Sequence, residues 1–136
     1  MEKVTLDAYL FFNGNCRDAM EFYQQVFGGE LEVKTYGEVD DSSSKAMKDR
    51  VMHANLTGGE VNLMASDGMD SDEIGTGKIS LALRGSDEKK LSKIFDDLSA
   101  SGKVGHPLEK QFWGDIYGDF TDKFDVCWMV SISNNA

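Results

Sequence analysis

The sequence predicts an α+β protein in which a βαβββ module occurs twice within one domain of 136 residues. Alternating or aromatic runs predict short β-strands, and two stretches carry apolar residues at helical spacing. The order strand, helix and three strands is followed by the same order again. We therefore expect a single domain, 1–136, with module one at about residues 1–70 and module two at about residues 76–136.

The first module opens with a strand, a turn and a helix in the stretch YLFFNGNCRDAMEFYQQVFGGEL, residues 9–31. Its aromatic run predicts a strand over residues 4–12. Asn15 is placed to cap a helix that begins near Cys16, because its side chain can accept a hydrogen bond from the first turn. An apolar stripe faces a core until Gly28 and Gly29 end the helix.

The rest of the first module reads as three strands. Leu31–Thr35 alternates as a half-buried strand does, and the polar stretch Glu38–Lys48 indicates a surface loop. Val51–Thr57 and Glu60–Ser66 are predicted strands joined by Gly58–Gly59, a two-residue hairpin signal.

The second module begins after the acidic, glycine-rich loop predicted over Asp67–Gly77. Lys78–Arg84 is a predicted strand, and Ser86 is placed to cap a helix. An apolar stripe follows at helical spacing, and Gly102 ends the helix. The remaining predicted strands are Val104–Phe112, Trp113–Phe120 and Val126–Ser133.

The two halves match at an offset of 71 residues, because Gly14 falls on Gly85 and Asn15 falls on Ser86. The apolar stripes of the two helices agree at the same offset. This agreement indicates an internal duplication of the βαβββ unit. One helix per four strands leaves one face of each sheet open, so paired units could enclose a cleft.

Composition excludes several classes of partner. The net charge of −10 argues against nucleic acid, which rewards lysine and arginine. No apolar run is long enough to cross a membrane, and the N-terminus lacks the apolar core of a signal peptide.

Cys16 and Cys127 could form a disulfide, but nothing in the context is secretory, so two reduced cysteines and a cytoplasmic location are expected.

Three stretches resemble the vicinal-oxygen-chelate superfamily, which includes glyoxalase I and the bleomycin-resistance proteins. They are residues 9–31, RVMHANLTGGEVNLMASD at 50–67 and WGDIYGDFTDKFDVCWMVSI at 113–132. The resemblance is greatest to the PhnB-like (3-demethylubiquinone methyltransferase-like) branch. One departure is the turn Asp122–Asp125, which lacks the proline and glycine of the DPFG-type turn usual in that branch.

The resemblance implies a glyoxalase/bleomycin-resistance/dioxygenase-like fold, with each module an incomplete barrel, a site in a cup, and a homodimer. In the superfamily's metal enzymes, four strands each supply one ligand, usually histidine or glutamate. Those positions fall on Ala8, on Asn62, near Ser80 and near Met129. We therefore predict no metal and no cofactor, and we do not expect glyoxalase I activity.

Polar residues of the predicted hairpin, residues 51–66, are the first candidates for a ligand site. A two-residue turn would pair Asn55 with Asn62 and place His53 on the same face. The resemblance implies that Ser80 lines the same cup as these polar residues, together with Ala82 and Cys127. His53 is the one candidate for a general base, since its reference pKa lies near neutrality. The alternative is a structural histidine that is hydrogen-bonded within the sheet.

Aromatic residues near the C-terminus are the second candidates. Trp113, Tyr117 and Trp128 could offer flat apolar walls to a ligand. Such residues more often pack in a core or an interface.

Three functions follow as hypotheses. The first is a PhnB-like protein that binds a small molecule in the cup without the usual metal. The second is a metal-dependent lyase, isomerase or dioxygenase with a displaced ligand set that includes His53. The third is a drug-sequestering protein like the bleomycin-resistance proteins, for which the net charge of −10 would favour a cationic ligand. We favour the first, and the sequence does not identify the ligand or a reaction.

Overall fold

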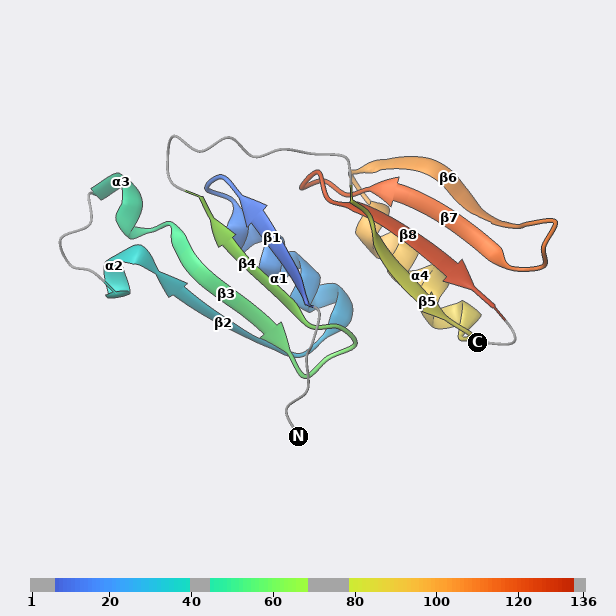
Figure 1. Cartoon of the computed structure of the whole chain (residues 1–136), viewed down its shortest axis with the longest axis horizontal. Helices are drawn as coiled ribbons and strands as arrows, with labels where there is room; N and C mark the ends of the chain where they lie inside the picture. The colour runs from blue at the N-terminus through green and yellow to red at the C-terminus, as the bar shows by residue number, and fades with distance from the viewer. Residues whose placement is uncertain (1–6, 40–44, 69–78, 134–136) are drawn as a thin grey trace. The chain divides into compact units, whose positions relative to one another are not determined.

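The computed structural model describes residues 7–39, 45–68 and 79–133 (Figure 1). The chain divides into two compact units, Met1–Ile74 and Gly75–Ala136. Each unit contains an open four-stranded sheet that mixes parallel and antiparallel pairs, together with a helix of twelve residues. This confirms the predicted α+β class with two βαβββ modules.

The first unit has the strand order β1-β4-β3-β2, in which only β1 and β4 are parallel. Four-residue helices occupy both described ends of the segment predicted as the loop Glu38–Lys48, so that prediction was partly wrong. Helices this short contain too few residues for a periodic pattern. The elements are β1 (Ala8–Phe12), α1 (Cys16–Phe27), β2 (Glu30–Thr35), α2 (Tyr36–Val39), α3 (Lys45–Lys48), β3 (Val51–Thr57) and β4 (Leu63–Asp67).

The β3–β4 connection differs from the predicted two-residue hairpin. Asn55 pairs with Met64, not with Asn62, and residues 58–62 form the connection. The reason is that this loop lies against the end of α1. Glu60 N donates to Phe27 O at 3.2 Å, and a Cβ on Gly59 would meet the carbonyl carbon of Gly28 at 2.6 Å. Gly59 therefore permits a close backbone approach instead of forming a tight turn.

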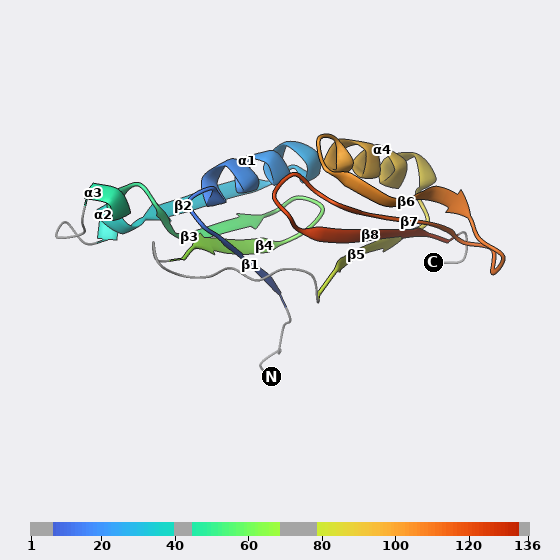
Figure 2. The same cartoon turned by 90° about the horizontal axis from the view of Figure 1, so that it is seen from above.

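The core of the first unit lies between α1 and one face of its sheet (Figure 2). The apolar stripe of α1 packs there, as its helical spacing predicted. The sheet supplies alternate residues of β3 and β4, because successive side chains point to opposite faces. The buried residues are Cys16, Ala19, Met20, Tyr23 and Phe27 of α1, with Ala54, Leu56, Leu63 and Ala65 of the strands.

The second unit repeats this arrangement with the strand order β5-β8-β7-β6. The first and fourth strands of each unit are parallel and adjacent, so the predicted repetition of the βαβββ order is confirmed. The aligned glycines are not equivalent, since Gly14 has φ +95° in a turn whereas Gly85 ends a strand. The elements are β5 (Leu81–Gly85), α4 (Glu88–Ser99), β6 (Lys103–Lys110), β7 (Ile116–Thr121) and β8 (Cys127–Ile132).

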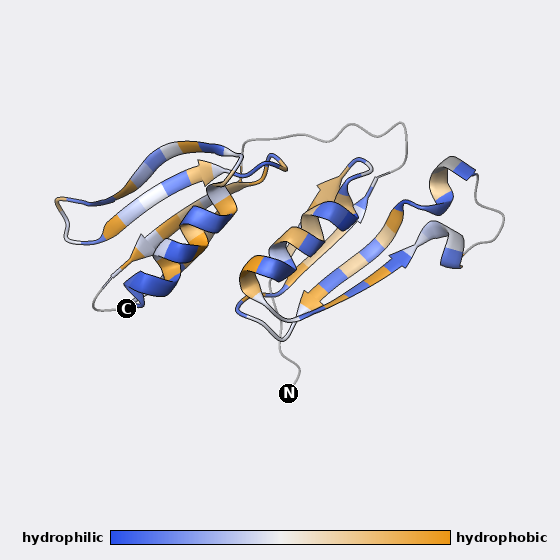
Figure 3. Ribbon diagram, turned by 180° about the vertical axis from the view of Figure 1, so that it is seen from behind, coloured by the Kyte–Doolittle hydropathy of each residue, from blue (hydrophilic) through white to orange (hydrophobic). Residues whose placement is uncertain are grey.

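Helix α4 buries one face of the second sheet. Phe95 packs edge-on against Phe120 with ring centroids 4.9 Å apart. The helix cap differs from the prediction, because Asp87, not Ser86, is the N-cap and accepts a hydrogen bond from Lys90 N at 3.1 Å. Both long helices show alternating hydrophilic and hydrophobic segments (Figure 3).

In the parts of the chain that the structure describes, no helix has the length and apolar character needed to cross a membrane.

Candidate functional site

The face of the first sheet opposite α1 carries a mixture of aromatic and polar side chains. Strand pairing places Tyr9, Met64 and Asn55 side by side on this face. Their neighbours along each strand point to the helix side. We call Tyr9, Phe11, His53, Asn55 and Met64 the first open face.

Tyr9 and His53 are joined on the first open face. The Tyr9 hydroxyl lies 3.2 Å from His53 Nδ1, and their ring centroids are 5.9 Å apart. The Phe11 ring is 5.1 Å from that of Tyr9 and is 58% exposed. The arrangement offers a ligand an aromatic surface beside a hydroxyl and an imidazole, which can each donate or accept a hydrogen bond.

The predicted polar residues of the first unit are only partly brought together. His53 and Asn55 lie half-buried on one face of β3, as predicted. Asn62 lies exposed in the loop before β4, because the hairpin register shifts by two residues. Tyr9 was not among the predicted site residues. The signal that would have found it is strand alternation, in which Tyr9 and Phe11 share one face and Leu10 lies on the other.

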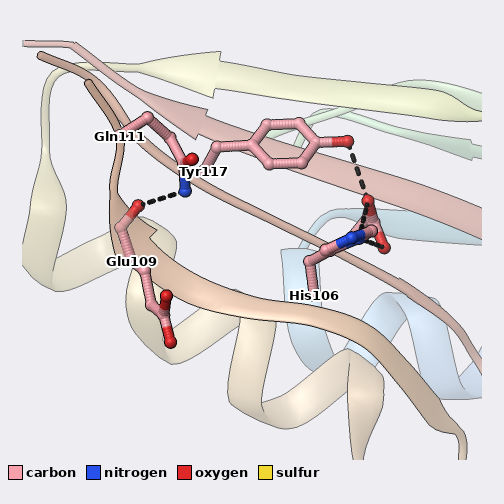
Figure 4. Close-up of polar contacts among 5 residues, drawn as sticks. His106, Glu109, Gln111 and Tyr117 are labelled. Carbon is pink, nitrogen blue, oxygen red and sulfur yellow. Dashed lines mark hydrogen bonds and ion pairs between the residues drawn. The ribbon is translucent and has the colours of Figure 1, made fainter. Parts of the chain in front are cut away.

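The equivalent face of the second sheet carries a hydrogen-bonded cluster (Figure 4). The Tyr117 hydroxyl donates to Asp119 Oδ2 at 2.9 Å, and His106 Nδ1 lies 3.1 Å and 3.0 Å from the two carboxylate oxygens. Burial raises the pKa of Tyr117, and the hydrogen bond and negative charge of Asp119 raise it further. His106 lies in the edge strand β6.

The other predicted residues of the second unit lie apart from this cluster. Ser80 is exposed just before β5. Trp113 lies in the β6–β7 turn, not in a strand, and packs edge-on against Phe112. Trp128 is buried in the core, where its indole Nε1 donates to Asp122 Oδ2 at 2.9 Å. Its role is therefore packing, the alternative that the sequence left open.

The residues at or near which the resemblance places the superfamily's metal positions do not match the usual ligand set. Ala8 pairs with Leu63, on the side of the sheet that α1 covers, and Asn62 and Ser80 are exposed. Met129 pairs with Asp119 and presents a thioether. Alanine has no donor atom, and a thioether does not replace imidazole or carboxylate. Among the described residues, no three histidine, cysteine, aspartate or glutamate side chains are grouped as metal ligands.

Comparisons with known proteins agree with this architecture. The sequence model of the Glyoxalase/Bleomycin resistance protein/Dioxygenase superfamily matches residues 5–130. Protein YjdN of Escherichia coli (strain K12) is 32% identical over 138 residues, covering 93% of this chain and 94% of that protein. Protein PA1353 from Pseudomonas aeruginosa is 37% identical, with a TM-score of 0.83 and coverage of 96% and 98% of the two chains.

A PhnB protein from Bacillus cereus has the same fold at lower identity. It is 22% identical, with a TM-score of 0.76, and the match covers 96% of this chain and all of that one (100%). At this identity the likeness concerns the fold alone.

Proposed function

The chain belongs to the Glyoxalase/Bleomycin resistance protein/Dioxygenase superfamily, and we propose that it is a small-molecule-binding protein of the PhnB-like and YjdN-like group. The ligand contacts the first open face. Binding does not use the superfamily's usual four-ligand metal set, since two of those positions hold Ala8 and Met129.

The observation that carries the proposal is the Tyr9–His53 hydrogen bond beside exposed aromatic surface. Tyr9 is 38% exposed, and Phe11 is more exposed still. Sites for small molecules are mostly apolar with a few well-placed polar groups. Here Phe11 and the Tyr9 ring supply the apolar surface, and His53 with the Asn55 amide supplies the polar groups.

A thermal-shift screen of small molecules tests the proposal, because a ligand that binds only the folded chain raises its melting temperature. We expect at least one compound to stabilise the wild-type protein and to lose most of that effect in His53→Gln. Gln25→Ala is the matched control, because Gln25 is exposed on α1, which covers the opposite face. Equal stabilisation of the wild type and His53→Gln would contradict the proposed site.

We also propose a homodimer, which the resemblance implies, and a cytoplasmic location, which the two unpaired cysteines favour. Sedimentation at several protein concentrations tests the dimer. A single species with the mass of one chain at all concentrations would contradict it.

A further inference from the structure

The cluster of His106, Asp119 and Tyr117 has a defined protonation pattern. A carboxylate only accepts hydrogen bonds, so both of its partners here must donate. His106 Nδ1 therefore carries a proton toward Asp119, just as the Tyr117 hydroxyl does. In the neutral imidazole, Nε2 is then left with a lone pair, and it has no hydrogen-bond partner among the described residues.

Two glycines beside this cluster leave space for its side chains and for close approach of the strands. A Cβ on Gly105 would collide with Asp119 Oδ1, so glycine at this position leaves room for the carboxylate. A Cβ on Gly118 would meet His106 O at 2.9 Å, so glycine also lets β6 approach β7 beside His106. Two register irregularities flank His106: the one between Val104 and His106 places His106 opposite Asp119, and the one between His106 and Glu109 places Glu109 opposite Tyr117.

The position of His106 leaves Nε2 accessible. Its side chain is 75% exposed, whereas that of Asp119 is 28% exposed. An inner carboxylate that orients an outer histidine is the arrangement by which proteins fix one tautomer and make the other ring nitrogen a proton acceptor. A surface ion pair would need neither the third partner Tyr117 nor the two glycines.

We propose that His106, oriented by Asp119, is a proton-accepting site for a neutral small molecule with a weakly acidic hydroxyl group, such as a phenol or an enol. The ligand's O–H bond breaks, its electron pair stays on the oxygen, and the proton forms an N–H bond at Nε2. Asp119 offsets the charge of the resulting imidazolium. The proposal goes beyond the function above, because it concerns the second sheet and assigns proton chemistry to it.

The charges around the cluster decide which ligands suit it. Asp119 disfavours a ligand that arrives as an anion, such as a carboxylate or a phosphate. The other charged residues placed on this face by strand pairing are Lys103, Glu109 and Arg84. In Figure 4 the Glu109 carboxylate lies apart from His106, with no contact drawn between them, and the Glu109 backbone oxygen accepts a hydrogen bond from Gln111 Nε2 at 2.9 Å.

The binding of para-nitrophenol tests the proposal, since its phenol and phenolate forms differ in colour. With the wild-type protein at a pH below the pKa of the dye, we expect a higher phenolate fraction than in buffer. His106→Gln should abolish the increase. Asp119→Asn should weaken binding by about 10- to 100-fold, the range found when a carboxylate that orients a metal-binding histidine is removed. Glu109→Gln removes a neighbouring carboxylate that does not touch His106, so it should behave like the wild type.

Nitrogen NMR of the imidazole gives a second readout that does not depend on the dye. At a pH where His106 is neutral, we expect the proton on Nδ1 in the wild type and a mixture of tautomers in Asp119→Asn. No rise in the phenolate fraction with the wild type, an unchanged rise in His106→Gln, or an Nε2–H tautomer in the wild type would each overturn the proposal.

Discussion

At the scale of single residues, Asp67 shows how a buried charge organises the first unit. It is 2% exposed, at the end of β4. Its Oδ1 accepts hydrogen bonds from Gly14 N at 2.7 Å and Cys16 N at 3.0 Å, and its Oδ2 accepts one from Val51 N at 2.9 Å. One side chain thus ties the β1–α1 turn, the start of α1 and the start of β3 to β4.

Asp67→Asn should lower the free energy of unfolding by about 2–4 kcal/mol, because an amide replaces one acceptor oxygen by a donor and leaves buried N–H groups unpaired. Urea denaturation measures the change. Asp49→Asn is the matched control, since Asp49 is exposed in the same unit. A similar loss in both variants would show that Asp67 is not the organising residue.

Cys16 makes the stability of the first unit depend on pH in the alkaline range. Burial, together with the nearby charge of Asp67, raises the pKa of its thiol from 9.0 to about 12, against a smaller lowering by Arg17. The unfolded chain loses this proton near pH 9 and the folded chain keeps it until about pH 12. The thiol's contribution to stability is therefore full below pH 9 and is lost as pH rises toward 12.

We expect Cys16→Ala to flatten the decline in stability between pH 9 and pH 12, relative to the wild type. Denaturation curves below and within this range measure the effect. Cys127→Ala is the control, because Cys127 is only partly buried. If the slopes of the wild type and Cys16→Ala agree throughout this range, the buried thiol is not the cause.

The candidate site residues show what the sequence could and could not predict at this scale. Alternation along β3 was enough to put His53 and Asn55 on one face. It could not show that Tyr9 reaches His53, because that contact joins β1 to β3 across β4. The His106–Asp119 pair was missed because it depends on register shifts in β6, which have no local signal.

At the scale of elements, the two long helices begin in different ways. In α4, the Asp87 side chain caps the first turn. In α1, Asn15 occupies the N-cap position but makes no side-chain cap hydrogen bond. Asp67, from a distant strand, accepts the hydrogen bond from Cys16 N instead. The sequence predicted the bounds of α1 because its apolar stripe is regular, but it could not predict a cap supplied from another element.

Asp87→Ala should cost about 0.5–2 kcal/mol of stability, as loss of an N-cap does in other helices. Asn15→Ala should cost clearly less, because Asp67 already satisfies the amide of Cys16. The two variants, compared by thermal or urea unfolding, form a matched pair. A larger cost for Asn15→Ala than for Asp87→Ala would refute this assignment of the caps.

The β3–β4 register is the element-scale prediction that failed. Gly58–Gly59 is a strong signal for a two-residue turn between strands. In the structure, Gly59 instead lies against the end of α1, and that contact decides the length of the connection. Local turn preference was overridden by packing between parts of the chain that are distant in sequence.

At the scale of the whole molecule, the sequence was enough to predict the duplicated topology. It was not enough to predict which side chains contact one another at the candidate sites. Both units have the same strand order, although their matched residues differ. The fold follows from helix stripes and strand alternation, which tolerate substitution. The chemistry depends on a few side chains, such as His53 and His106, whose partners lie on other strands.

Native mass spectrometry tests the central claim most directly, because it counts both small molecules and metal ions bound to each chain. The protein should be purified without chelators or a histidine tag and then mixed with the compounds that raise its melting temperature. We predict that the wild type binds such a compound without a metal, and that His53→Gln loses it while Gln25→Ala keeps it. A near-stoichiometric metal that disappears in His53→Gln would contradict the account and would indicate a metal site built around His53.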